Sequence, residues 1–204
     1  MENLTNYYLL ARRALLNSEY SDVIEYYKKI LVNNPNDWEA IFYTHCAKLE
    51  IAGFDEIEDI LDGLNNDLYR IFSLLAQNPM PEEWKTDFVL QCSNYIFTLT
   101  CTVTGKYWDL TECGLYANHY LEIRHCYNLF NCYKICYRFC DVIEFYFPGN
   151  TKILKEILDM RKFIAEWHQH DQKKYFDPHR IKYSKDYLEE NISKLQKLSL
   201  KLNS

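Results

Sequence analysis

Glycine and proline are scarce in this chain, and that scarcity limits the folds open to it. The sequence has 204 residues but only five Gly and five Pro, whereas an all-β protein of this length needs many more turns. Hydrophobic residues make up 48% of the sequence, so material for a core is ample. Apolar residues recur at steps of three and four, as in residues 4–17, which is the period of an amphipathic helix. The sequence therefore predicts an all-α protein.

The positions of the helix-breaking residues and the apolar pattern together predict seven to nine helices in a single domain spanning residues 1–204. We expect helical hairpins in residues 1–77, central helices in 82–168 and a C-terminal helix at 184–202. Ser21 is the expected N-cap of the second helix. We also expect a break or kink at residues 65–66, a helix ending near 103 and a turn at 105–109. Residues 111–147 are expected to form two helices or one kinked helix, residues 151–168 another helix, and residues 169–183 an irregular segment.

Charge and cysteine usage favour an ordinary cytoplasmic protein. The net charge of −6 argues against bulk binding of nucleic acid. The lysine-rich C-terminal part is interleaved with acidic residues, which is typical of a solvated helix face. No secretory signal is visible, so the eight Cys are expected to be reduced thiols. The longest charge-free run, residues 88–105, is too polar for a membrane span and fits a buried helix better.

The first 35 residues have the spacing of one helical repeat unit. Small residues stand at Ala11 and Ala14, where a second helix could approach closely. Larger residues that would fill the groove between the two helices follow at Val23, Tyr27 and Ile30. The residue before Pro35 leaves the helical region, so the hairpin ends there.

This pattern resembles the tetratricopeptide repeat family. The residues that match its positions are Tyr7, Leu10, Ala11, Val23, Tyr27, Ile30 and Pro35. A degraded second copy follows 34 residues later, with His45 at the small-residue position. The resemblance covers roughly residues 4–64. The segment Asn-Pro-Asn-Asp-Trp-Glu-Ala at 34–40 also resembles segments of short tetratricopeptide-like proteins from low-GC bacteria, many of unassigned function.

The resemblance implies antiparallel helical hairpins that continue into a right-handed helical array or bundle. It also implies that the protein binds a peptide or helix of a partner protein. Its concave groove would present Tyr8 and Arg12 from the first hairpin, and Phe42 and Cys46 from the second. An aromatic anchor beside an Arg donor is good recognition chemistry. The alternative is that Tyr8 and Phe42 pack beneath the later helices, which would cap or fill the groove. A homo-oligomer is also possible for such a scaffold.

Two groups of Cys, His and acidic residues could in principle hold a metal. The first comprises His119, His125, Cys126, Cys132, Cys136 and Cys140. Cys132, Cys136 and Cys140 lie four residues apart on the apolar side of an amphipathic helix, and no Cys-x-x-Cys pair occurs, so core packing is the preferred interpretation. The second comprises Glu166, His168, His170 and Asp171, which we interpret as a polar surface loop, with a metal or acid–base site as the alternative.

No sequence motif indicates catalysis. Gly-rich phosphate loops, nucleophile elbows and zinc-protease helices are all missing from the sequence. We therefore expect a protein-interaction scaffold that is not an enzyme and has no cofactor or metal. Two alternatives stay open: a nucleic-acid-associated or host-directed regulator acting through the Lys-rich C-terminal helices, and a metal-binding protein using the Cys/His helix.

Overall fold

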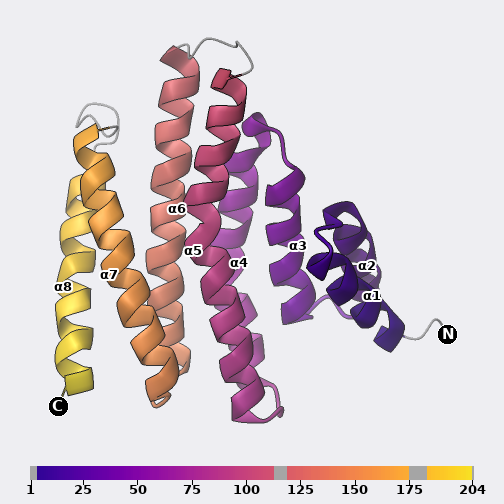
Figure 1. The fold of residues 1–204 in the computed structure, drawn as a ribbon. Helices are drawn as coiled ribbons and strands as arrows, with labels where there is room; N and C mark the ends of the chain where they lie inside the picture. Colours follow the sequence, from indigo (N-terminus) through magenta and orange to yellow (C-terminus); the bar gives the residue numbers. More distant parts are fainter. Residues whose placement is uncertain (1–3, 113–118, 175–182, 204) are drawn as a thin grey trace. The chain divides into compact units, whose positions relative to one another are not determined.

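A computed structural model describes residues 4–112, 119–174 and 183–203, and all regular secondary structure in these residues is helical (Figure 1). The all-α prediction is therefore confirmed. The helices are α1 (Leu4–Leu16), α2 (Tyr20–Asn33), α3 (Trp38–Ile51), α4 (Ile57–Gln77), α5 (Glu82–Glu112), α6 (His119–Tyr146), α7 (Thr151–Lys174) and α8 (Ser184–Asn203), with a short 3-10 turn, Phe54–Glu56, before α4. None of the helices in the described residues combines the length and apolar character that a membrane span requires.

The helices group into two compact units, Met1–Pro79 and Met80–Ser204, here called unit 1 and unit 2. The boundary falls in the Asn-Pro-Met-Pro segment at residues 78–81, where the sequence predicts the end of a helix. That helix end is confirmed, since α4 stops at Gln77 and α5 starts at Glu82. The organisation of the chain as one domain stays a prediction.

In unit 1, each helix packs against its neighbour along the chain. α1 contacts α2, α2 contacts α3, and α3 contacts α4, so the opening hairpin expected from the sequence is present. Ala11 and Ala14 of α1 are buried, and so are Val23, Tyr27 and Ile30 of α2. The small side chains let the two helices approach closely while the larger ones fill the space between them. The interior contacts expected for this hairpin are therefore confirmed.

A buried carboxylate joins the first three helices of unit 1. Glu39, near the start of α3, accepts hydrogen bonds from Nε and Nη2 of Arg12 at 2.7 and 2.6 Å. The hydroxyl of Tyr27 donates to the same carboxylate at 3.0 Å. Asp37 caps α3 by accepting from the backbone N–H of Ala40 at 2.8 Å, and it also accepts a hydrogen bond from the Tyr8 hydroxyl. Arg12 and Tyr8 thus fix α1 to the start of α3.

We expect Glu39→Gln to lower the free energy of unfolding by about 1–3 kcal/mol, because a neutral amide cannot accept all three charge-assisted hydrogen bonds in this buried position. The matched control is Glu25→Gln, which removes an exposed pair with Lys29 on α2 and should have little effect on stability, because solvent screens the pair. Urea denaturation followed by circular dichroism measures both. Equal losses in the two variants would contradict the role given to Glu39.

Several helix boundaries differ from the sequence prediction. α2 starts at Tyr20 after Ser18, which has a positive φ of 59°, so the expected N-cap at Ser21 is wrong. The expected break at residues 65–66 is also wrong, because the buried stripe of α4 continues through it with Leu64 and Leu68. Packing of that stripe outweighs the low helix propensity of two Asn residues.

The helices α5 and α7 of unit 2 are longer than expected. The turn predicted at residues 105–109 is helical in the structure, and α5 continues to Glu112. Val103 and Tyr107 lie buried four residues apart on one face, and their packing compensates for the helix-weakening Gly105. The segment expected to be irregular is helical as far as Lys174. The rest of it, residues 175–182, lies outside the described residues.

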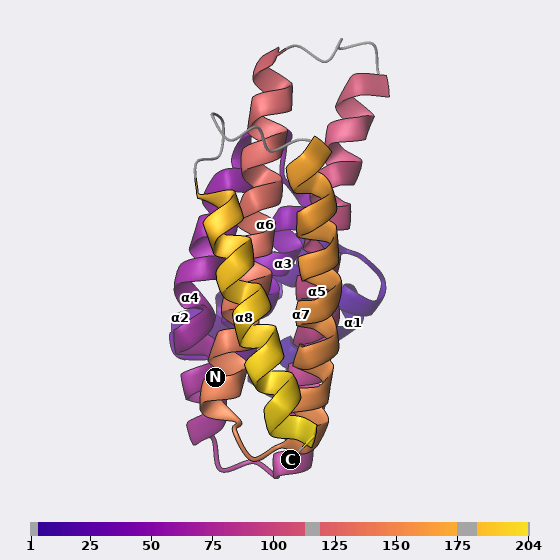
Figure 2. The same ribbon diagram turned by 90° about the vertical axis from the view of Figure 1, so that its left-hand side faces the viewer.

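In unit 2, α5, α6 and α7 pack against one another in pairs, and α8 packs against α7 (Figures 1 and 2). The core-facing stripe of α6 contains Cys132, Cys136 and Cys140, all fully buried. The Cys136 thiol lies 3.4 Å from the carbonyl oxygen of Ile96 on α5. Burial raises the pKa of the Cys140 thiol to about 12. The prediction that these Cys act as small core residues is confirmed.

Unit 2 also contains a fully buried arginine. Arg161 of α7 donates through Nη2 to Asp141 of α6 at 2.7 Å and through Nη1 to the side-chain oxygen of Asn191 of α8 at 2.8 Å. Lys194 of α8 donates to the other oxygen of Asp141, also at 2.7 Å. Three helices therefore meet at one carboxylate.

Candidate functional site

The four residues expected to line a tetratricopeptide-like groove separate into two environments. Phe42 is fully buried and packs edge-on against Tyr43, with ring centroids 5.3 Å apart, and Cys46 is buried one turn further along α3. Tyr8 and Arg12 lie on α1, where Asp37 and Glu39 already hold their polar groups. No partner can reach the Phe42 ring in this arrangement, so an open groove through all four residues requires a rearrangement of unit 1.

The Cys/His helix shows core packing at the side chains the structure describes. His125 is buried and stacks on Tyr107, with centroids 4.2 Å apart and planes 7° apart. Burial lowers the pKa of His125 to about 4. Among the described residues, no three His, Cys, Asp or Glu side chains are arranged to hold a metal ion. The side chain of His119 lies outside what the structure describes.

The second His and acidic group is helical, and helical geometry divides it. His168 points into the core of unit 2, where it stacks on Tyr133 at 4.7 Å and its Nε2 lies 2.7 Å from the hydroxyl of Ser184. His170 and Asp171 face a cavity, whereas Glu166 lies on a different groove. The polar-loop interpretation is therefore wrong for these residues, because α7 continues through them.

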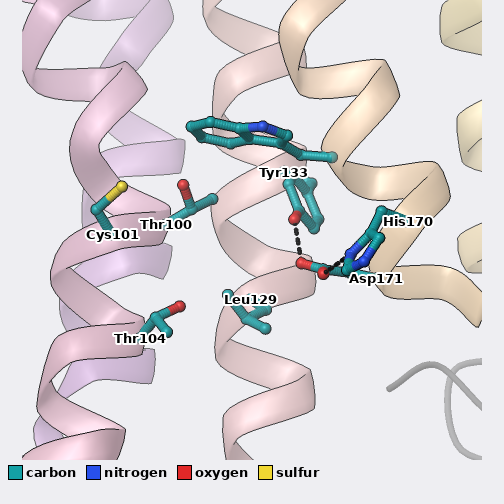
Figure 3. Close-up of a pocket in the computed structure, with 8 residues that line it drawn as sticks. Thr100, Cys101, Thr104, Leu129, Tyr133, His170 and Asp171 are labelled. Atoms are coloured by element: carbon teal, nitrogen blue, oxygen red, sulfur yellow. Dashed lines mark hydrogen bonds and ion pairs between the residues drawn. The ribbon is translucent and has the colours of Figure 1, made fainter. Parts of the chain in front are cut away.

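The cavity lies between α5, α6 and α7 and has a volume of about 460 Å³ (Figure 3). Each helix contributes residues from successive turns of one face. The lining residues are Thr100, Cys101 and Thr104 of α5, Leu129 and Tyr133 of α6, and Trp167, His170 and Asp171 of α7.

A chain of polar groups runs along one wall of this cavity. The Tyr133 hydroxyl donates to Asp171 Oδ2 at 2.5 Å, and His170 Nδ1 lies 3.1 Å from Asp171 Oδ1 (Figure 3). On the opposite wall, the Thr100 hydroxyl is buried and has no hydrogen-bond partner in the described part of the chain. Burial, together with the hydrogen bond to Asp171, raises the pKa of the Tyr133 phenol, which therefore stays a donor.

A second hollow is an elongated groove between α7 and α8, with a volume of about 870 Å³. Its apolar lining residues are Leu158, Ala165, Ile192, Leu195 and Leu200. Charged side chains border it on α7, namely Asp159, Lys162 and Glu166. The groove is thus an apolar channel with a charged edge, and sequence reasoning missed it because it depends on how α8 packs on α7.

The lysines of α8 are largely engaged with carboxylates. Lys194 pairs with both Asp141 and Glu190 at 2.7 and 2.8 Å. Longer contacts join Lys185 to Glu189 and Lys201 to Glu144, at 3.7 and 3.8 Å. Such pairing neutralises the basic character that a nucleic-acid site would need. It fits the solvated helix face expected from the sequence.

Comparisons of this chain with protein-family profiles, with curated proteins and with solved structures found no match.

Proposed function

We propose that this protein is an interaction scaffold that binds an amphipathic helix of a partner protein in the groove between α7 and α8, without catalysing a reaction. The observation that supports the proposal is the groove itself. Its apolar lining residues Leu158, Ile192, Leu195 and Leu200 are at least partly exposed, and Ala165 is buried beneath them. A partner helix that inserts its apolar stripe between two helices is a recurring mode of recognition.

The length of the groove suits a short helix. On α7, the lining residues extend from Leu158 to Gln169, which at a rise of about 1.5 Å per residue is about 16 Å, or three helical turns. On α8, they extend from Ile192 to Leu200. A partner helix of about three turns would place anchors at i, i+4 and i+7 against this floor.

The charges at the edge favour one kind of partner. Asp159 and Glu166 outnumber Lys162 along the α7 side of the groove, and the whole chain carries a net charge of −6. A helix with basic residues beside its apolar stripe would meet a complementary potential, which raises the association rate and selects the orientation.

The tetratricopeptide-like arrangement of α1 to α4 as a right-handed array, and a cytoplasmic location, belong to the same proposal. The support for the arrangement is the α1–α2 hairpin with Ala11 and Ala14 buried at its interface. In this scheme unit 1 is a structural scaffold, and the binding surface is in unit 2.

The test compares two exposed leucines on different units. Leu200→Asp places a charge in the groove, at a residue that is 73% exposed. The control Leu16→Asp places a charge on α1, outside the groove, at a residue that is 87% exposed. We expect Leu200→Asp to reduce partner recovery from host-cell extract at least about tenfold, since a buried carboxylate in an apolar interface costs more than 1.4 kcal/mol. Leu16→Asp should recover the partner fully, as measured by quantitative mass spectrometry.

Light scattering distinguishes a second copy of the chain from a different partner. If the occupant is a second copy, wild type is a dimer and Leu200→Asp is a monomer. Recovery of the same proteins in the same amounts by wild type and Leu200→Asp would overturn the groove as the binding site.

A further inference from the structure

We propose that the cavity between α5, α6 and α7 is a binding site for a small organic cation, a protonated amine carried on a flat apolar body. The inference is independent of the α7–α8 groove, because the two hollows share no lining residue. Three features of the cavity carry it: its charge, an unsatisfied hydroxyl and an aromatic wall.

The charge of the cavity favours a cation. Asp171 is the acidic residue among the lining side chains, and neither Lys nor Arg is among them. Tyr133 and His170 each engage one oxygen of the Asp171 carboxylate, so that its position is fixed. A carboxylate can accept about four hydrogen bonds, and each oxygen therefore keeps capacity for a donor that enters the cavity. An ammonium group supplies such donors together with the opposite charge.

The Thr100 hydroxyl is a second, independent indication of a ligand. Thr100 is 5% exposed, and its Oγ1 has no hydrogen-bond partner in the described structure. Figure 3 shows Thr100 on α5 facing the same space as Tyr133 and Asp171. Leaving a buried hydroxyl unpaired is destabilising, so a threonine is a poor choice here for stability alone. A polar group on a ligand would satisfy it.

The aromatic wall suits a flat apolar body. The Trp167 indole lines the cavity, and Phe97 holds it from α5 with ring centroids 5.1 Å apart. Phe163 packs edge-on against Phe97 at 6.1 Å, so the indole is supported from behind. A cation near an indole face is attracted by the negative potential of the ring. The volume of about 460 Å³ lies in the range of small-molecule sites.

The first experiment varies the charge of the probe at constant shape. Phenethylamine and tryptamine are titrated into the protein by calorimetry, beside the neutral 2-phenylethanol and the anionic 3-phenylpropionate. We expect at least one aryl amine to bind with a dissociation constant below about 1 mM, 2-phenylethanol at least tenfold more weakly, and 3-phenylpropionate not at all. Absence of binding by both aryl amines at 10 mM, or equal binding of phenethylamine and 2-phenylethanol, would overturn the proposal.

The second experiment separates a ligand contact from a structural role. Thr100→Val removes the unpaired hydroxyl at nearly constant volume, so we expect the unfolding midpoint to stay the same or rise while amine affinity falls at least threefold. Thr98→Val is the matched control on α5, since Thr98 is exposed and its hydroxyl donates to its own helix at Tyr95. It should leave amine affinity unchanged.

Asp171→Asn tests the charge of the site itself. The amide can still accept from Tyr133 but no longer attracts an ammonium, and amine affinity should fall at least tenfold. Unchanged affinity in both Asp171→Asn and Thr100→Val would refute the site even if an amine binds elsewhere on the protein.

Discussion

Replacing Asp141 with alanine is expected to lower the free energy of unfolding by about 3–5 kcal/mol, because it leaves a buried positive charge without its carboxylate. The guanidinium of Arg161 is fully buried and donates to Asp141 at 2.7 Å. The same substitution removes one partner of Lys194, which is partly exposed and keeps Glu190. Most of the loss therefore comes from Arg161. Urea denaturation followed by circular dichroism measures it.

Two further variants identify the cause of that loss. Glu144→Ala, one turn along α6, breaks the 3.8 Å contact with Lys201 and removes a charge that acts on Arg161 without a hydrogen bond to it. It should cost less than about 1 kcal/mol. The double variant Asp141→Ala/Arg161→Met should recover part of the stability, because it removes the stranded charge as well as its partner. A double variant less stable than Asp141→Ala alone would show that lost packing, not the unpaired charge, dominates.

Acidification from pH 6.5 to pH 4 is expected to destabilise the protein by several kcal/mol through two buried histidines. Burial lowers the pKa of His168 and of His125 to about 4 in the folded protein, whereas an unfolded histidine has a pKa near 6.5. Between these values the unfolded chain binds more protons than the folded one, so each histidine removes about 1.4 kcal/mol of stability per pH unit as the pH falls. Above about pH 7.5 both histidines are almost entirely neutral in both states, and this dependence vanishes.

The contribution of His168 can be isolated by substitution. His168 lies between Tyr133 and Tyr137 of α6 and Ser184 of α8, and Asp171 is the nearby charge that partly opposes the effect of burial. His168→Gln keeps a hydrogen-bonding side chain without a titration, and should reduce the slope by about 1.4 kcal/mol per pH unit. His170→Gln is the control, since that side chain is 72% exposed. Identical slopes for wild type and His168→Gln between pH 6.5 and 4 would contradict the prediction.

The sequence predicts the helices well where breakers and apolar stripes agree. Pro35 and Pro79 follow the ends of α2 and α4, and the buried residues of α1 and α2 are the expected ones. The predicted helix ends are wrong where a helix-breaking residue is outweighed by tertiary packing, because the sequence alone does not show which helices will contact each other. Gly105 has a low helix propensity, but burial of Val103 and Tyr107 on the same face keeps α5 helical.

The sites were harder to predict than the helices. The expected groove residues Phe42 and Cys46 lie in the core. A repeat-based assignment leaves one face of α3 open, whereas α3 is buried on several faces, with consecutive residues from Glu39 to Tyr43 buried. The cavity was missed because residues 169–174 were expected to be irregular. With α7 extended through them, Trp167 and Asp171 stand one turn apart on one face, and the same spacing relates Thr100 to Thr104 and Leu129 to Tyr133. A correct helix boundary would have made this constellation visible.

Packing between sequence neighbours in unit 1 has a consequence for how the protein is made. Because α1, α2, α3 and α4 each contact the next helix along the chain, their association closes only short loops, and the entropic barrier to folding is low. Residues 1–79 leave the ribosome before the residues of α5 do. Unit 1 can thus bury Ala11, Tyr27 and Phe42 during translation, so that its apolar surface is shielded from aggregation while the longer helices of unit 2 are still being synthesised.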